Sequence, residues 1–165
     1  MTDHTGHAVV VTGGASGIGR AIARRFGAAG ALVVVADLDD AGAKSVAADI
    51  GPDARSIRCD VTDESQVNAA AQLAVQEFGK LDVMVNNAGI CVLGPLVGLS
   101  AEDFERMIAV NLKGTLYGIK AAASRMPNGG AIITTASTAG LNGAPLLGGY
   151  GATKAGIINL TKTAA

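Results

Sequence analysis

The sequence has few charged residues and no stretch in which basic residues gather. Charged side chains make up 16% of the 165 residues, against about 25% in ordinary soluble domains. The formal net charge is −1, and no run of Lys and Arg is longer than two residues. The sequence therefore offers no basic surface for a nucleic acid, and its low charge indicates that part of the surface is covered, as in an oligomer or a protein with a further segment.

Long apolar runs and leader-like segments are also absent. The apolar stretches are well under the roughly 18 residues of a membrane span. The N-terminal stretch MTDHTGHAVVV has no basic region of the kind that opens a secretory signal. We therefore expect a cytoplasmic protein with no membrane partner.

Cysteine is scarce, and the chain has only Cys59 and Cys91, without a C-x-x-C spacing. Each follows an expected strand, which predicts buried free thiols rather than a disulfide. His4 and His7 lie close together, but they have no cysteine or carboxylate partners, so we interpret them as part of a solvated tail and expect no metal.

Short β-branched runs separated by helical patterns are the main feature of the chain. The runs are mostly apolar rather than alternating, which is typical of parallel strands covered by helices on both faces. Ser100 and Asp103 resemble a capping box ahead of one long helix that continues to Ile119. With no linker or repeat, the sequence predicts one α/β domain over residues 1–165, and its expected strands are 8–12, 31–37, 55–59, 81–87 and 131–137.

A glycine-rich turn, TGGASGIG, directly follows the first expected strand. Gly13, Gly17 and Gly19 stand where glycine lets the backbone approach a phosphate and lets a helix N-terminus face its negative charge. Arg20 and Ala21 follow, in place of the Lys-Ser/Thr pair of a nucleoside triphosphatase loop. The turn favours a dinucleotide over a nucleoside triphosphate, although a purely structural turn could show the same pattern.

Asp37 ends the second expected strand, eighteen residues after Gly19. A carboxylate at this place binds the ribose hydroxyls of a dinucleotide, and it repels the 2′-phosphate of NADP. We therefore expect NAD as the cofactor. The alternative is that Asp37 is a solvated acid at the start of a loop.

Tyr150 and Lys154 are four residues apart, so they share one face of a helix. Hydride exchange at a carbonyl carbon requires a group that exchanges a proton with the oxygen. The pKa of a free tyrosine is about 10, and a cation one helical turn away lowers it. The pair can therefore act as a proton-transfer unit, but an isolated pair at this spacing is more often an ordinary feature of a helix surface.

The ordered set TGGASGIG, CDVTD, NNAG, Asn111, Ser137 and YGATK resembles the classical short-chain dehydrogenase/reductase family over residues 10–162. The resemblance implies that Tyr150 is the catalytic acid/base and that Lys154 also binds the nicotinamide ribose. It implies that Asn111 holds a water in a proton relay. Ser137, expected at the carboxyl end of the last strand, can orient the substrate oxygen.

The resemblance also implies a cofactor-binding cleft along the carboxyl ends of the strands. Asp60 would contact the adenine with Val61 beside it, and residues 86–89 would line the middle of the cleft. Asp60 could instead start the next helix, and Asn86 and Asn87 could simply cap a strand. The residues expected to bind NAD are Gly13, Ser16, Gly17, Ile18, Gly19, Asp37, Asp60, Val61, Asn87, Ala88, Gly89, Tyr150 and Lys154.

Members of this family usually continue to roughly 250 residues, through further strands and a substrate lid. We therefore expect a C-terminally truncated form: a Rossmann-type doubly wound parallel sheet of about five strands in the order 3-2-1-4-5, incomplete at its C-terminal edge. The last strand would be an unpaired edge, and the later strands and the lid would be absent.

Two functions from different classes follow. The first is an NAD(H)-dependent oxidoreductase that interconverts a secondary alcohol and a ketone, and the second is a non-catalytic NAD-binding module without a closed substrate pocket. Ser137 together with Tyr150 favours the enzyme. Apolar loops at 91–99 and 140–149 suggest a hydrophobic alcohol or ketone, or they pack under a lid. The resemblance implies a homodimer or homotetramer.

Overall fold

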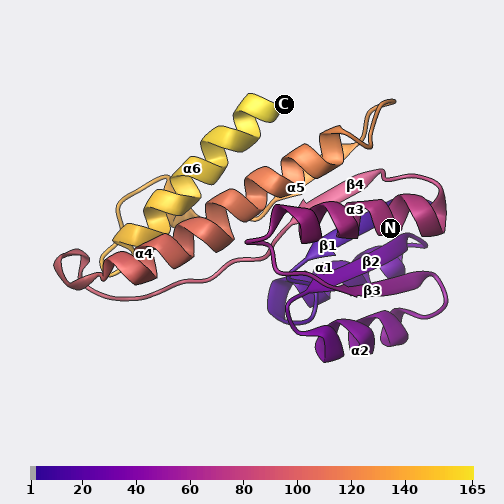
Figure 1. The fold of residues 1–165 in the computed structure, drawn as a ribbon, viewed down its shortest axis with the longest axis horizontal. Coiled ribbons are helices and arrows are strands. Elements are labelled where there is room, and N and C mark those ends of the chain that lie inside the picture. Colours follow the sequence, from indigo (N-terminus) through magenta and orange to yellow (C-terminus); the bar gives the residue numbers. More distant parts are fainter. Residues whose placement is uncertain (1–2) are drawn as a thin grey trace.

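A five-stranded parallel sheet organises residues 3–165, the part of the chain that the computed structural model describes (Figure 1). The strand order is β3-β2-β1-β4-β5. This confirms the predicted fold class and the predicted order. The strands are β1 (Ala8–Thr12), β2 (Leu32–Asp37), β3 (Ala54–Arg58), β4 (Val83–Asn86) and β5 (Ala131–Thr134).

Helices cover both faces of the sheet, which explains why the central strands are apolar throughout. Val9 and Val11 of β1 lie in the core cluster with α1 and α2, whereas Val10 lies in the opposite cluster with α3 and α5. All three valines are fully buried. The helices are α1 (Gly17–Gly27), α2 (Asp40–Ile50), α3 (Glu64–Phe78), α4 (Ala101–Met107), α5 (Gly114–Ala123) and α6 (Gly148–Ala164).

The helix expected after Ser100 begins as predicted but is not a regular α-helix throughout. The hydroxyl of Ser100 accepts a hydrogen bond from the Asp103 N–H at 3.0 Å and so caps α4. Between α4 and α5 the chain forms a π-helical segment, η2, at Ile108–Lys113. π-Helical segments are rare in proteins, but many of those that occur are found at functional sites. Such a segment also changes the direction of the side chains that follow it. Asn111 lies in this segment.

The strand β5 forms the edge of the sheet in the described part of the chain, as expected. It pairs with β4 alone, its residues are half-buried or exposed, and Ile133 is 44% exposed. It is also shorter than the predicted 131–137. After Thr135, whose N–H still donates to the Asn86 carbonyl, the chain leaves the sheet and forms a short 3-10 turn, η3, at Thr138–Gly140.

The predicted burial of one cysteine and the predicted exposure of one histidine need correction. Cys59 is a buried free thiol as predicted, but Cys91 is exposed, because the chain after β4 crosses the carboxyl edge of the sheet as a loop. His4 is half-buried rather than solvated, since its ring packs against Phe26 with 5.0 Å between centroids. Within residues 3–165, no helix combines the length and apolar composition that a membrane crossing requires.

The close approach of α5 to β4 depends on a missing side chain. A Cβ placed on Gly118 would lie 1.8 Å from the Oδ1 atom of Asn86. Asn86 is only 5% exposed, and within the described residues its side-chain nitrogen and oxygen have no hydrogen-bond partner. The carboxamide is therefore packed against the helix backbone at this point.

Substitution of Gly118 by Ala should destabilise the fold. Overpacking of a tight contact costs roughly 1–3 kcal/mol, which outweighs the helix-propensity gain of about 1 kcal/mol. Denaturant unfolding of the two proteins measures the difference. Gly98→Ala is the control, because a Cβ there meets nothing within 4 Å. A Gly118→Ala protein as stable as the wild type would contradict the close packing.

Candidate active site

The turn between β1 and α1 has the backbone conformation that its glycines predict. Gly13 has φ +65° and Gly17 has φ +50°, in the left-handed region that favours glycine. A Cβ on Gly19 would lie 2.0 Å from the Gly13 carbonyl oxygen. Glycine at these positions therefore lets the turn fold tightly onto the N-terminus of α1, which begins at Gly17.

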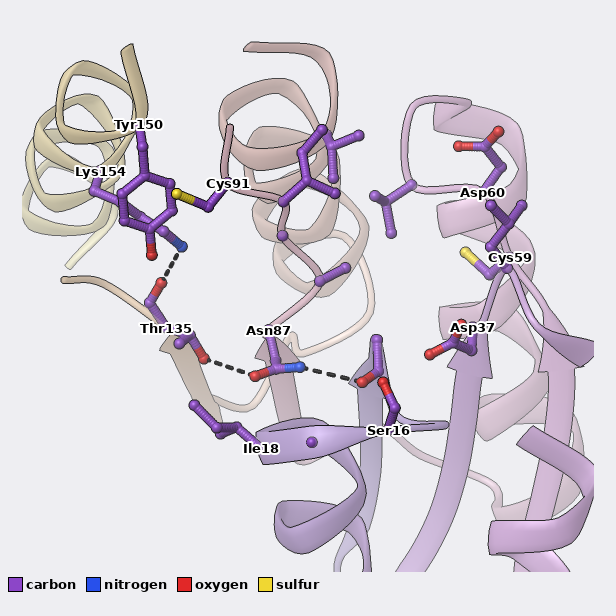
Figure 2. A pocket seen from close by; sticks show the side chains of 18 residues that line it. Ser16, Ile18, Asp37, Cys59, Asp60, Asn87, Cys91, Thr135, Tyr150 and Lys154 are labelled. Atoms are coloured by element: carbon purple, nitrogen blue, oxygen red, sulfur yellow. Dashed lines mark hydrogen bonds between the residues drawn. The ribbon is translucent and has the colours of Figure 1, made fainter. Parts of the chain in front are cut away.

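A cavity of about 460 Å³ lies along the carboxyl ends of the strands, next to this turn (Figure 2). Every residue that the sequence predicted to bind the cofactor lines it, apart from Gly19. The sequence interpretation missed six further lining residues. Of these, Cys59 and Thr135 directly follow strands β3 and β5, so their position at the carboxyl edge could have identified them. The six are Leu38, Cys59, Ile90, Cys91, Val110 and Thr135.

The two acidic residues of the cavity have different environments. Asp37 ends β2, and its Oδ2 accepts a hydrogen bond from the Ala15 N–H at 2.9 Å, which ties the carboxylate to the glycine turn. The carboxylate of Asp60 accepts from the N–H and the hydroxyl of Thr62. Asp60 does not start a helix, since α3 begins at Glu64 with Asp63 as its cap.

A chain of hydrogen bonds crosses the cavity from the glycine turn to α6 (Figure 2). The Nδ2 atom of Asn87 donates to the carbonyl oxygens of Thr12 at 3.1 Å and Gly13 at 3.2 Å. Its Oδ1 accepts from the Thr135 hydroxyl at 3.2 Å, and the Thr135 carbonyl accepts from Lys154 Nζ at 2.6 Å. Asn87 therefore does more than cap its strand, because it connects β1 with the loop after β5.

Tyr150 and Lys154 lie on the face of α6 that lines the cavity. The ring of Tyr150 points into the cavity (Figure 2), and Lys154 Nζ lies 5.6 Å from the ring centroid. Within the described residues, the Tyr150 hydroxyl has no hydrogen-bond partner. Lys154 is 3% exposed, and burial lowers the pKa of its ammonium group. The pair therefore presents a free phenol beside a partly desolvated cation.

Ser137 does not line the cavity, although it lies near α6. Its side chain caps the turn η3 by accepting from the Ala139 N–H at 3.2 Å, and in the described part of the chain its own proton is not donated. The turn sits directly on α6, since a Cβ on Gly151 would be 2.6 Å from the Ala139 carbonyl oxygen. The glycine after Tyr150 therefore lets the Ser137 turn approach the tyrosine's helix.

Asn111 also lies outside the cavity and is fully buried. Its Oδ1 accepts from the Ile90 N–H at 2.8 Å, and its Nδ2 donates to the Ile90 carbonyl and to the Thr153 hydroxyl. The carboxamide thus binds the cavity loop at Ile90 to α6 at Thr153. Its role in holding a water stays a prediction.

The strand order, the glycine turn after β1 and the acid at the end of β2 define a Rossmann-type α/β protein. The chain belongs to the short-chain dehydrogenase family, because the family described as "short chain dehydrogenase" matches residues 7–165. This confirms the resemblance found in the motifs.

Similar proteins include galactitol 2-dehydrogenase of Agrobacterium fabrum, which is 43% identical over 94% of this chain. Sorbitol dehydrogenase of Cereibacter sphaeroides is 41% identical over 96% of this chain. The chain spans 62% and 63% of the lengths of these two relatives. A crystal structure of a short chain dehydrogenase/reductase from Burkholderia phymatum in complex with NAD matches with TM-score 0.93 and 34% identity, over 99% of this chain and 60% of that one.

The two cysteines of the cavity should differ sharply in reactivity. Burial, with the nearby Asp60, Asp37 and Asp63 carboxylates, raises the pKa of the Cys59 thiol to about 12. We expect a maleimide at mildly alkaline pH to label Cys91 in the folded protein and to reach Cys59 only after unfolding. Mass spectrometry counts the labels, and Cys91→Ser is the control that should take none while folded. Labelling of Cys59 in the folded protein would contradict its burial.

Proposed function

We propose that the protein is an NAD(H)-dependent oxidoreductase that interconverts a secondary alcohol and a ketone, with Tyr150 as the acid/base. The observation that carries the proposal is that the glycine turn, Asp37 and the Tyr150–Lys154 pair line one cavity. A site that binds a phosphate-containing cofactor and transfers a proton accounts for these groups lying in the same cavity.

The residues of the cavity fit a dinucleotide. Gly13 and Gly17 leave the turn without side chains where a phosphate would meet the N-terminus of α1. Asp37 is fixed by the Ala15 N–H on Oδ2 and by the Asp39 N–H on Oδ1, and the remaining lone pair of each oxygen is available to ribose hydroxyls. The same negative charge would repel a 2′-phosphate, which supports NAD over NADP.

The chemistry then divides between the cofactor and the chain. A bound nicotinamide cofactor would supply the hydride acceptor for the alcohol carbon and, in its reduced form, the hydride donor for the ketone carbon. Tyr150, as phenolate, takes the proton from the alcohol oxygen, and as phenol it returns that proton to the ketone oxygen. Lys154 favours the phenolate by its positive charge.

Ser137 supplies the second contact to the substrate oxygen in this proposal. Its hydroxyl proton is not donated within the described residues, so it is available to an oxygen that gains negative charge. The close packing of its turn against Gly151 supports this role, because the contact brings the turn to the helix of Tyr150.

The substrate class rests on the comparisons and on the loops beside the cavity. The two relatives are named for galactitol and sorbitol, which carry secondary hydroxyl groups. Exposed Leu96, Val97 and Leu141 in the loops favour a substrate with an apolar part. A panel of secondary alcohols should therefore include both polyols and hydrophobic alcohols.

A homo-oligomer stays a prediction, which sedimentation would test.

Replacement of Tyr150 by Phe should abolish turnover and leave NADH binding nearly unchanged. Loss of a general acid/base costs on the order of 10²- to 10⁴-fold in rate, whereas Phe keeps the ring. The absorbance of NADH measures turnover, and fluorescence titration measures binding. Turnover equal to that of the wild type in this variant would contradict the role of Tyr150 as acid/base. NADH binding by the wild type without turnover on any alcohol would favour the alternative of an NAD-binding module.

Asp37→Asn should reduce the preference for NAD over NADP by roughly tenfold or more, a change in binding free energy of about 1.4 kcal/mol. The amide removes the charge that repels a 2′-phosphate and keeps an oxygen that can accept from the Ala15 N–H, although it loses the acceptor for the Asp39 N–H. The ratio of the two affinities, rather than either affinity alone, therefore reports the charge. Titration with NADH and NADPH gives the ratio of dissociation constants. Asp39→Asn is the matched control, because Asp39 caps α2 outside the cavity and Asn also caps helices well. An unchanged ratio in Asp37→Asn would refute the role of this carboxylate.

A further inference from the structure

Thr135 is a lining residue of the cavity to which neither the motifs nor the proposed mechanism gives a role. It directly follows β5, and its N–H extends the strand pairing by donating to the Asn86 carbonyl at 3.0 Å. Its side chain and its carbonyl contact different parts of the cavity: the hydroxyl contacts Asn87, and the carbonyl contacts Lys154.

The polarity of the hydrogen bonds around Asn87 follows from its neighbours. The carbonyl oxygens of Thr12 and Gly13 can only accept, so the NH₂ group of Asn87 must face them. The Oδ1 atom then faces the other way and needs a donor. The Thr135 hydroxyl, at 3.2 Å, is that donor, so its proton is committed to Asn87.

The Asn87 carboxamide also sits in a narrow space. Its Nδ2 would be 2.5 Å from a Cβ on Gly19 and 3.1 Å from one on Gly13. A rotation of the carboxamide would turn Oδ1 toward two carbonyl oxygens, which is unfavourable, and would leave the NH₂ group facing Thr135. The two carbonyl oxygens therefore set the orientation of the carboxamide, and the Thr135 hydroxyl satisfies the Oδ1 acceptor in that orientation.

We propose that Thr135 is a positioning residue for the cofactor cleft, acting through Asn87. Its hydroxyl stabilises the Asn87 carboxamide in the orientation that the two carbonyl oxygens require, and that carboxamide holds the backbone of Thr12 and Gly13 at the place where the phosphates would bind. Its carbonyl holds Lys154 at 2.6 Å, so one residue relates the position of the glycine turn to that of the Tyr150–Lys154 pair. This inference rests on the proposed use of the cavity by NAD(H).

The test compares Thr135→Val, which keeps the shape but removes the hydroxyl, with Thr135→Ser, which keeps the hydroxyl. Loss of one hydrogen bond should weaken NADH binding by roughly 3- to 10-fold in Thr135→Val. Thr135→Ser should stay within roughly twofold of the wild type. Fluorescence titration measures the binding, and circular dichroism checks that each variant is folded. If the valine variant does not fold, Thr135→Ala provides the hydroxyl-free comparison.

A second measurement does not depend on the cofactor. The side-chain NH₂ signals of Asn87 in a ¹⁵N-labelled protein, assigned by their loss in Asn87→Ser, should shift or broaden in Thr135→Val and stay in place in Thr135→Ser. Unchanged signals and unchanged NADH affinity in Thr135→Val would overturn the inference. Equal losses of affinity in both variants would also overturn it, since they would indicate packing rather than the hydroxyl.

The two measurements separate this inference from the proposed function. A wild-type protein that binds no NADH would contradict the proposed function. The Asn87 signals would then decide alone whether Thr135 stabilises the carboxamide in this orientation.

Discussion

The reversal of strand order between β1 and β4 opens the cavity on which every other feature of the site depends. From β1 the chain crosses to β2 on one side of the sheet, and it later returns on the other side to form β4 and β5. The loops that leave β1 and β4 therefore separate at their carboxyl ends, as in other open α/β sheets. Asn87 bridges this gap by binding the backbone of Thr12 and Gly13. The two loops therefore leave a cleft between them while hydrogen bonds hold them at a fixed separation.

Close backbone approaches keep the functional segments in place around this gap. Gly118 admits the Asn86 side chain between α5 and β4, and Gly151 lets the turn of Ser137 lie on α6. A larger side chain at either position would move an element that carries part of the site. These two glycines thus serve the geometry of the fold, because the absence of a Cβ sets the packing distance at each contact.

The sequence predicted features that depend on local pattern and missed those that depend on the surroundings. Strand β1 was predicted with the correct ends, because its valines are buried on both faces. The π-helical segment was missed, since a 3.6-residue apolar period continues across Ile108–Lys113 without a visible break. Cys91 was wrongly predicted to be buried because residues beyond a strand end can either continue inward or cross the surface. Thr135 was missed because the predicted strand continued to residue 137, whereas β5 ends at Thr134, and because its partners, Asn87 after β4 and Lys154 in α6, are far away in sequence.

The proton-transfer pair shows why a motif alone describes a site incompletely. The spacing of Tyr150 and Lys154 places them on one helix face, but it does not say where the lysine's charge is held. In the structure Lys154 is buried and donates to the Thr135 carbonyl, while the Tyr150 hydroxyl is left without a partner in the described residues. A buried ammonium needs such a partner to remain charged. The backbone after β5 therefore helps to keep the cation beside the phenol, and the pair depends on the sheet edge as much as on its own helix.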